Sequence, residues 1–181
     1  PSGPAQRAML RDALKDAGIT PQQVDFIETH GTGTPLGDPI EVSAIGRVFC
    51  EDRENALYLG AVKANVGHLD SAAGITGLIK VVLSLQHKTI PLHRNFSEPN
   101  RHIPWDDWPI KIPLENTAWE SKERFAGISA FGMSGTNVHI IVGEAPEPSV
   151  PNERQLSTSR TKQLFTLSAC TERALSVLTK R

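Results

Sequence analysis

The pattern that most restricts the fold is a strand, a glycine-containing loop and a helix, which occurs twice with a histidine near the end of the strand. The first unit combines "VDFIETH" (24–30) with "GTGTPLG" and a helix that begins at Asp38-Pro39. The second combines "ALYLGAV" (56–62), His68 and a helix predicted over 70–88. Strands that alternate with helices favour the α/β class. Because sites in open α/β sheets gather at the carboxyl ends of strands, both histidines are candidate site residues.

The remaining segments complete this picture and suggest where a boundary lies. Apolar residues at helical spacing predict a helix over 5–17, ended by Gly18. Two strands are predicted over 124–131 and 137–145, joined by "GMSGT", and the proline-punctuated stretch 89–119 is predicted to be irregular. After Pro146 the chain becomes polar and rich in Pro and Ser. We therefore expect a domain over 1–146, a linker over 147–162 and the beginning of a further unit over 163–181.

Composition excludes several classes of function. The net charge of −1 over 181 residues gives no reason to expect binding to nucleic acid or to an anionic membrane. The longest apolar stretch, "GLIKVVLSL", is short and interrupted by Lys80, so no membrane span is expected. Cys50 and Cys170 form no disulfide pattern, which is typical of a reducing, cytoplasmic location.

The residues around the histidines admit more than one interpretation. "GTGTPLGD" lacks the Lys-Ser/Thr of a P-loop and the glycine spacing of a dinucleotide site, so a phosphate loop is disfavoured. A metal site would need His30, His68 and Asp38 together, but no short ligand spacing supports it, and we predict no metal. A catalytic pair of histidines and two unrelated histidines in turns both stay open on these grounds.

Two further features also have alternative interpretations. Lys63 lies near the end of an apolar strand, where a charge is costly unless it is paired, and Glu41 is its predicted partner. The alternative is that both are unrelated surface charges. "GISAFGMSGTNVH" places Phe131 and Met133 in a glycine-rich turn between two strands. This is either a plain hairpin or a gate whose apolar side chains move aside for substrate.

Three motifs in order carry a resemblance to a known family. "ETHGTGT", "KANVGH" followed by "AAG", and "SAFGMSGTNVH" resemble the C-terminal half of a β-ketoacyl synthase, in particular the ketosynthase domain of a type I polyketide synthase. The resemblance covers residues 1–146, and "QLFTLSACTERAL" resembles the beginning of the adapter between ketosynthase and acyltransferase domains. It implies a thiolase-like layered αβαβα fold, of which this chain would be the C-terminal half only.

The resemblance also implies roles for particular residues. His30 and His68 match the two histidines of the family's Cys-His-His set, and Lys63 matches its supporting lysine. Asp38 and Glu41 match the acidic residues of the supporting network.

The channel and the gate are matched in the same way. Thr32 and Thr34 match threonines that line the phosphopantetheine channel, and Phe131 and Met133 occupy the gating turn. Many relatives in fatty-acid synthesis have Phe where this chain has Met133, so a more adaptable side chain is expected to affect gating or chain preference.

The nucleophile of the family lies elsewhere. It is a Cys in a "TACSS"-like motif of the N-terminal half, and no such motif occurs here. Cys50 follows a helix among acidic residues, where a thiolate is disfavoured, and Cys170 lies beyond the predicted linker. Neither is a candidate nucleophile, and the isolated chain is expected to be inactive.

The implied reaction is decarboxylative Claisen condensation of an acyl thioester with a malonyl-type unit on acyl carrier protein, an acyltransferase activity. No cofactor would be bound directly, because substrates arrive on the phosphopantetheine of the carrier protein. The implied partners are the N-terminal half of the same ketosynthase, the acyl carrier protein, the adjacent acyltransferase domain and a second copy in a homodimer. Two alternatives are a non-catalytic lobe used for packing or docking, and a thiolase-type enzyme acting on coenzyme A esters. Thiolases have a second Cys in place of one histidine, and "GTNVH" argues against them.

Overall fold

The computed structural model describes residues 1–146, 169 and 171–178. The chain forms two compact units, Pro1–Ala145 and Pro146–Arg181, and each is considered by itself. In the second unit the described residues include one helix, α5 (Glu172–Leu178). The predicted linker over 147–162 lies outside the described residues, as do residues 163–168, 170 and 179–181 of the further unit predicted over 163–181. The three-part division of the chain stays a prediction.

The first unit is built around a five-stranded sheet in the order β4-β2-β1-β6-β7. β1 pairs in parallel with both β2 and β6, β2 pairs in parallel with β4, and β7 runs antiparallel to β6. Two further strands, β3 and β5, pair antiparallel in a small second sheet. The strands are β1 (Val24–Glu28), β2 (Leu57–Gly60), β3 (Thr89–Ile90), β4 (Ile110–Lys111), β5 (Thr117–Ala118), β6 (Phe125–Phe131) and β7 (Asn137–Gly143).

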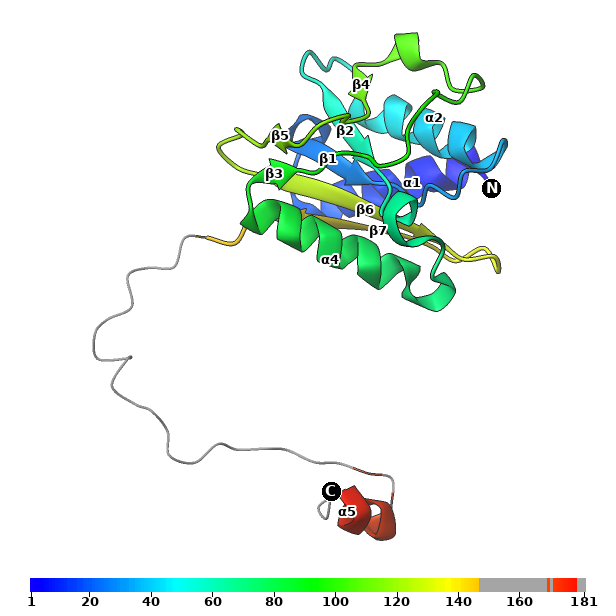
Figure 1. The fold of residues 1–181 in the computed structure, drawn as a ribbon, viewed down its shortest axis with the longest axis vertical. Helices are drawn as coiled ribbons and strands as arrows, with labels where there is room; N and C mark the ends of the chain where they lie inside the picture. The colour runs from blue at the N-terminus through cyan, green and yellow to red at the C-terminus, as the bar shows by residue number, and fades with distance from the viewer. Residues whose placement is uncertain (147–168, 170, 179–181) are drawn as a thin grey trace, which may run out of the picture. The chain divides into compact units, whose positions relative to one another are not determined.

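Helices cover both faces of the five-stranded sheet (Figure 1). α1 and α2 share one apolar core with β1 and β2, and α4 shares a second core with β1 and β6 on the opposite face. Along β1, Ile27 belongs to the first core and Phe26 to the second, as the alternation of a strand requires. The helical segments are α1 (Gly3–Ala17), η1 (Pro21–Gln23), α2 (Gly37–Phe49), α3 (Lys63–Val66), η2 (Asp70–Ala72), α4 (Ala73–Gln86) and η3 (Trp105–Asp107).

The predicted α/β class and most of the predicted elements are confirmed. α1 ends at Gly18, which has a φ of 67° and caps the helix through its backbone N–H. The segments around "GMSGT" form the predicted hairpin, with Phe131 opposite Asn137 at its closed end. Helix α4 is shorter than the predicted 70–88 because the chain first forms the 3-10 turn η2.

Two elements differ from the prediction. β2 ends at Gly60, two residues before the end of the strand predicted over 56–62, and Lys63 begins the short helix α3. The strand ends there because its register with β1 stops at Glu28, and the backbone N–H of Val62 donates to the Glu28 carboxylate instead. The stretch 89–119, predicted to be irregular, contains β4, which extends the sheet beyond β2.

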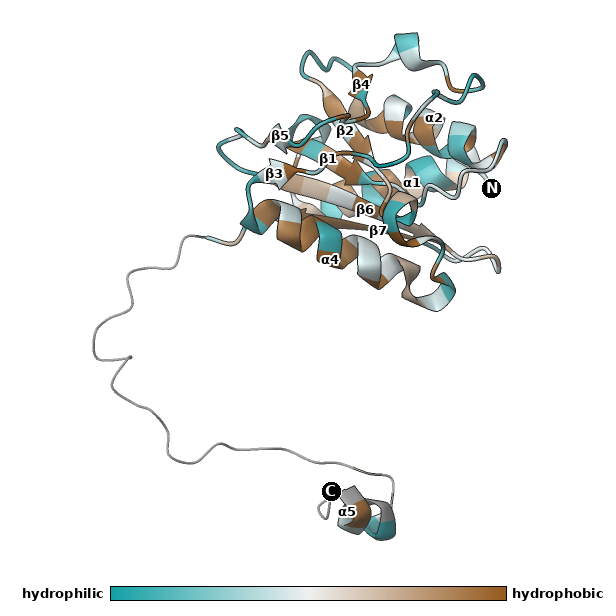
Figure 2. Ribbon diagram, in the orientation of Figure 1, coloured by the Kyte–Doolittle hydropathy of each residue, from teal (hydrophilic) through white to brown (hydrophobic). Residues whose placement is uncertain are grey.

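Helix α4 is rich in apolar residues (Figure 2), and several of them are exposed. Ile75 and Ile79 are each 54% exposed, Leu83 is 48% exposed and Val82 is 37% exposed. These positions follow helical spacing, so they form one continuous stripe on the side of α4 that faces away from the sheet. Within the described residues, no helix is long and apolar enough to cross a membrane.

Candidate active site

The two histidines predicted to meet at the sheet edge do so. His30 is the second residue after the end of β1. His68 lies in the loop after α3, and α3 itself follows β2. Because β1 and β2 are parallel neighbours, their carboxyl ends deliver both imidazoles to the same edge. The ring centroids are 5.9 Å apart and the ring planes are inclined at 85°.

Backbone hydrogen bonds fix the same tautomer in both rings. The N–H of Phe131 donates to Nδ1 of His30 over 3.3 Å, and the N–H of Asp70 donates to Nδ1 of His68 over 3.0 Å. A neutral imidazole that accepts at Nδ1 carries its proton on Nε2. The arrangement therefore leaves each ring with an Nε2–H that can donate to a group between or beside them.

The electrostatic surroundings keep His30 neutral. Burial contributes most, and together with the positive charge of Lys63 and the nearby His68 it lowers the pKa of His30 to about 4. At a pH near 7 the ring is therefore an uncharged hydrogen-bond donor. A neutral imidazole of this tautomer can donate its Nε2–H to an oxygen on which negative charge develops.

Glu41 holds the backbone around His30 in place. Its side chain is buried in α2 and accepts from the N–H of His30 over 2.7 Å and from the N–H of Gly31 over 3.0 Å. Burial raises the pKa of Glu41 to about 7, although those two N–H donors oppose the rise. Gly31 has a φ of 44°, and a Cβ there would lie 2.8 Å from that of Ala61, so only glycine allows this turn.

The predicted ion pair between Lys63 and Glu41 is wrong. Within the described residues, no carboxylate oxygen lies within 4.0 Å of the Lys63 amine, and the two oxygens of Glu41 instead accept from backbone N–H groups. Burial lowers the pKa of Lys63, and the charges of Glu28, Glu41 and Asp38 oppose that effect from longer range. Lys63 is thus a half-buried cation surrounded by three acidic groups rather than the partner of one.

The buried ion pair of this region joins two residues that the sequence did not single out. Lys80 on α4 lies 2.6 Å from Glu28 at the end of β1, and only 2% of the Glu28 side chain is exposed. A signal was present, because each residue is the one charge in an otherwise apolar segment, "FIE" and "GLIKVVLSL". Nothing in the sequence links them across 52 positions.

A cavity of about 670 Å³ brings together His30 and the residues predicted for the channel and the gate. Its lining includes Thr32 and Thr34 from the loop after β1, and Phe131 and Met133 from the β6–β7 turn. The Phe131 ring lies 5.1 Å from the His30 ring, and Met133 is fully exposed at the tip of the turn. In the part of the chain that the structure describes, His68 contacts His30 but does not line this cavity.

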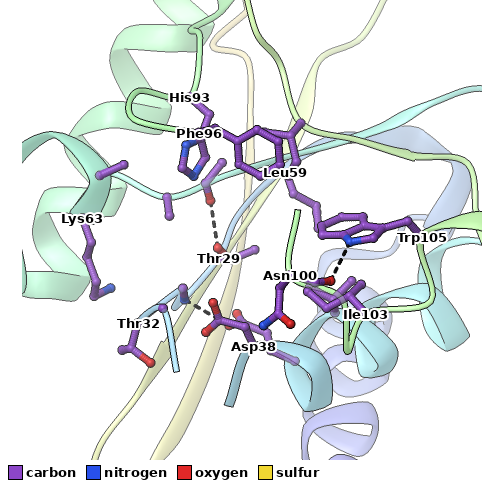
Figure 3. Close-up of a pocket in the computed structure, with 18 of the residues that line it drawn as sticks. Thr29, Thr32, Asp38, Leu59, Lys63, His93, Phe96, Asn100, Ile103 and Trp105 are labelled. Atoms are coloured by element: carbon purple, nitrogen blue, oxygen red, sulfur yellow. Dashed lines mark hydrogen bonds between the residues drawn. The ribbon is translucent and has the colours of Figure 1, made fainter. Parts of the chain in front are cut away.

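A second cavity, of about 380 Å³, lies beside the first (Figure 3). Lys63, Thr32 and Asp38 line one side, and Phe96 and Trp105 from the segment between β3 and β4 line the other. Burial raises the pKa of Asp38, and backbone N–H groups of the loop over 32–34 oppose the rise. Asp38, Glu41 and Lys63 therefore form one group of ionisable side chains that lines the second cavity.

Known protein families match the chain over nearly its whole length. Residues 1–97 match the family described as the C-terminal domain of beta-ketoacyl synthase, and residues 99–181 match the ketoacyl-synthetase C-terminal extension. The chain belongs to the β-ketoacyl synthase family. The resemblance predicted from the three motifs is confirmed.

Curated relatives of this ketoacyl synthase chain are polyketide synthases. It is 48% identical over 151 residues to erythronolide synthase EryA2 of Saccharopolyspora erythraea, covering 81% of this chain and 4% of the relative. It is 42% identical over 153 residues to polyketide synthase GfsA of Streptomyces halstedii, covering 82% of this chain and 2% of the relative. The chain therefore spans only a small part of the curated relatives it matches.

Solved ketosynthase structures share the fold of this family member. The ketosynthase from module 6 of the bacillaene synthase of Bacillus subtilis 168 matches with a TM-score of 0.77 at 36% identity, covering 99% of this chain and 30% of that chain. Ketosynthase twelve of the bacillaene polyketide synthase in Bacillus amyloliquefaciens matches with a TM-score of 0.77 at 38% identity, covering 81% of this chain and 27% of that chain. The fold is the C-terminal portion of the thiolase-like ketosynthase fold, as predicted.

Proposed function

We propose that this chain supplies the two-histidine half of a ketosynthase active site. The complete enzyme would act as an acyltransferase that catalyses decarboxylative Claisen condensation of an acyl thioester with a malonyl-type unit. The observation that carries the proposal is the pair of adjacent imidazoles, each with Nδ1 occupied by a backbone N–H and Nε2–H left to donate. Membership of the ketoacyl synthase family supports the same assignment.

The proposed reaction needs such a pair of donors. The acyl chain is held as a thioester on a cysteine outside this chain. The bond between the α-carbon and the carboxylate of the malonyl group breaks, CO₂ leaves, and the electron pair becomes an enolate. His30 and His68 donate their Nε2–H groups to the enolate oxygen, and one donor of this kind contributes about 3 kcal/mol of transition-state stabilisation. The enolate carbon then attacks the thioester carbonyl and expels the cysteine thiolate.

The other predicted site residues take supporting roles in this proposal. Lys63 helps to keep the His30 ring neutral, because its positive charge lowers the pKa of His30. Glu41 fixes the backbone of His30, and Asp38 contributes negative charge near Lys63. These roles require no cofactor bound to the chain itself.

The channel residues also keep their proposed roles. Thr32 and Thr34 line the cavity beside His30, where a thin phosphopantetheine arm of an acyl carrier protein would lie. One of them has a structural task as well, since the Thr34 hydroxyl accepts from the N–H of Gly37 at the beginning of α2. Phe131 and Met133 line the same cavity from the β6–β7 turn, and their proposed role is to move aside for substrate.

The partners of the complete enzyme follow from the same family assignment. We infer that the apolar stripe on α4 is covered by the N-terminal half of the ketosynthase, because exposing Ile75, Ile79 and Leu83 to water is unfavourable. An acyl carrier protein, an adjacent acyltransferase domain and a second ketosynthase copy complete the proposed assembly. Relatives of this chain that are polyketide synthases many times its length support these partners.

The proposal is tested by replacing His68 in the complete ketosynthase. His68→Ala should slow decarboxylation of a malonyl thioester by about 10²- to 10³-fold, because one oxyanion donor is lost. Acylation of the nucleophilic cysteine, followed by mass spectrometry, should change little. His102→Ala is the matched control, since His102 is exposed and lies in the segment between β3 and β4. Normal decarboxylation by His68→Ala would remove the proposed role.

A further inference from the structure

Glu28 is buried where three elements meet. It is the last residue of β1, and its two oxygens have different partners. Oε1 accepts from the backbone N–H of Val62, and Oε2 lies 2.6 Å from the amine of Lys80 on α4. One carboxylate therefore connects the strand that leads to His30, the segment that leads to Lys63 and the helix beneath them.

Glycines at two neighbouring positions allow the Glu28 carboxylate and the Lys80 amine to fit between the sheet and α4. A Cβ added at Gly60 on β2 would lie 2.9 Å from the Lys80 amine. A Cβ added at Gly77 on α4 would lie 3.2 Å from Cγ of Glu28. The Lys80 amine also lies 5.4 Å from the centre of the Phe26 ring, at a distance that favours a cation–π contact. The pair is thus enclosed by the sheet and by α4.

The bond to Val62 is the one that reaches the site. Val62 immediately precedes Lys63, the first residue of α3, and the C-cap residue of α3, Gly67, immediately precedes His68. The backbone pairing of β1 with β2 stops at Glu28 and Gly60. Beyond that point the segments that follow the two strands are joined by side chains and single backbone contacts. Where the chain passes from β2 to α3, the hydrogen bond from the Val62 N–H to the Glu28 carboxylate takes the place of a backbone hydrogen bond between the strands.

We propose that Glu28 is a positioning residue, which is held by Lys80 and uses its hydrogen bond to Val62 to set the α3 turn, and with it Lys63 and His68, relative to His30. This inference rests on the proposed function, because it concerns the alignment of the same two histidines. Misplacement of a reacting group by 1 Å can cost about 10²-fold in rate. The chemistry at the enolate is therefore sensitive to this support, whereas acylation of a cysteine outside the chain is not.

A test must separate alignment from stability, because a lone charge left by a single substitution is itself destabilising. Two double variants of the complete ketosynthase remove both charges and differ in one property. Glu28→Gln with Lys80→Met keeps an oxygen that can accept from Val62. Glu28→Met with Lys80→Met has similar size but no acceptor. The measured quantities are malonyl decarboxylation, acylation of the nucleophilic cysteine and the melting temperature.

The expected result is a difference between the two double variants. The variant with Met at both positions should decarboxylate about 10- to 100-fold more slowly than the Gln-Met variant, with acylation within about 2-fold. A milder variant, Glu28→Asp, withdraws the carboxylate by one methylene and should show the same selective loss of decarboxylation. It provides the test if the Met-Met protein does not fold. Equal decarboxylation by the paired variants, wild-type decarboxylation by Glu28→Asp, or parallel loss of acylation would overturn the inference.

The same measurements distinguish this inference from the proposed function. If His68→Ala decarboxylates at the wild-type rate, the two-histidine function itself has failed. If His68→Ala is impaired while Glu28→Asp and the acceptor-free variant are not, the function stands and only the role of Glu28 is lost.

Discussion

At the level of single residues, two lysines close to the site have opposite surroundings. Lys80 is paired with Glu28 at 2.6 Å, whereas within the described residues Lys63 has no carboxylate within 4.0 Å. Removing one partner of a buried pair leaves an uncompensated charge, at a cost on the order of 3–5 kcal/mol. Removing an unpaired, half-buried lysine leaves no such charge behind.

We therefore expect Lys80→Met to lower the stability of the complete ketosynthase by several kcal/mol and Lys63→Met to change it by less than about 1 kcal/mol. Urea denaturation of both variants measures the difference, with Lys122→Met as an exposed control. A larger loss for Lys63→Met than for Lys80→Met would contradict this assignment of the buried pair.

Individual site residues could be predicted from the sequence to different degrees. His30 and His68 were accessible because each follows a strand in a glycine-containing loop, and parallel strands bring such loops together. The partner of Lys63 was not, because spacing cannot show that both oxygens of Glu41 already accept from backbone N–H groups. The pair of Glu28 and Lys80 was also missed, since its members approach only after α4 has packed on the sheet.

At the level of elements, the β6–β7 hairpin contains a buried histidine. His139 on β7 is hydrogen bonded through Nδ1 to the Ser129 hydroxyl on β6 over 2.9 Å. Burial lowers the pKa of His139 to about 4, against an ordinary value of 6.5. The unfolded chain therefore binds a proton at a higher pH than the folded hairpin does. The contribution of His139 to stability is complete above pH 6.5 and is lost as the pH falls towards 4.

This contribution amounts to roughly 3 kcal/mol across that range. We expect His139→Asn in the complete ketosynthase to be less stable at neutral pH but to lose less stability than the wild type between pH 7.5 and pH 5. Urea denaturation at both pH values measures the difference. Glu41, whose pKa is raised to about 7, acts in the opposite direction in both proteins and cancels in the comparison. Parallel pH dependences would contradict the prediction.

Elements with a clear period were predicted and short ones were not. α1, α2, α4 and the hairpin each contain enough residues for a helical or alternating pattern to stand out. α3 has four residues and β4 has two, so neither shows a period. β4 is also flanked by prolines in the sequence, and only its pairing with β2 makes it a strand.

At the level of the whole molecule, the chain contains the two histidines of the proposed site but no candidate for its nucleophilic cysteine. Cys50 is buried after α2, and burial raises the pKa of its thiol to about 11. A thiol with such a pKa supplies almost no thiolate at neutral pH. We expect the isolated chain to remain unmodified when incubated with an acyl thioester, whereas the complete ketosynthase takes up one acyl group. Mass spectrometry distinguishes the two, and rapid stoichiometric acylation of Cys50 or Cys170 would contradict the assignment.

The two-half architecture itself could be predicted only through the resemblance to ketosynthases. Periodicity indicates an α/β layer, but it does not show that a further layer is needed. In the structure, the apolar stripe of Ile75, Ile79 and Leu83 lies on the side of α4 that faces away from the sheet, which is the surface that the proposed N-terminal half would cover.

The hydrogen bond from Phe131 to His30 couples the proposed gating turn to the proposed oxyanion donor. The N–H that fixes the His30 tautomer belongs to the same turn that bears Met133, so the turn and the imidazole cannot change state independently. A turn that swings aside to admit an acyl chain withdraws this N–H and leaves the His30 proton free to reside on either nitrogen. In the proposed cycle, opening of the turn to load an acyl chain would remove the hydrogen bond that fixes His30 as a donor, so loading and decarboxylation would take place at different times.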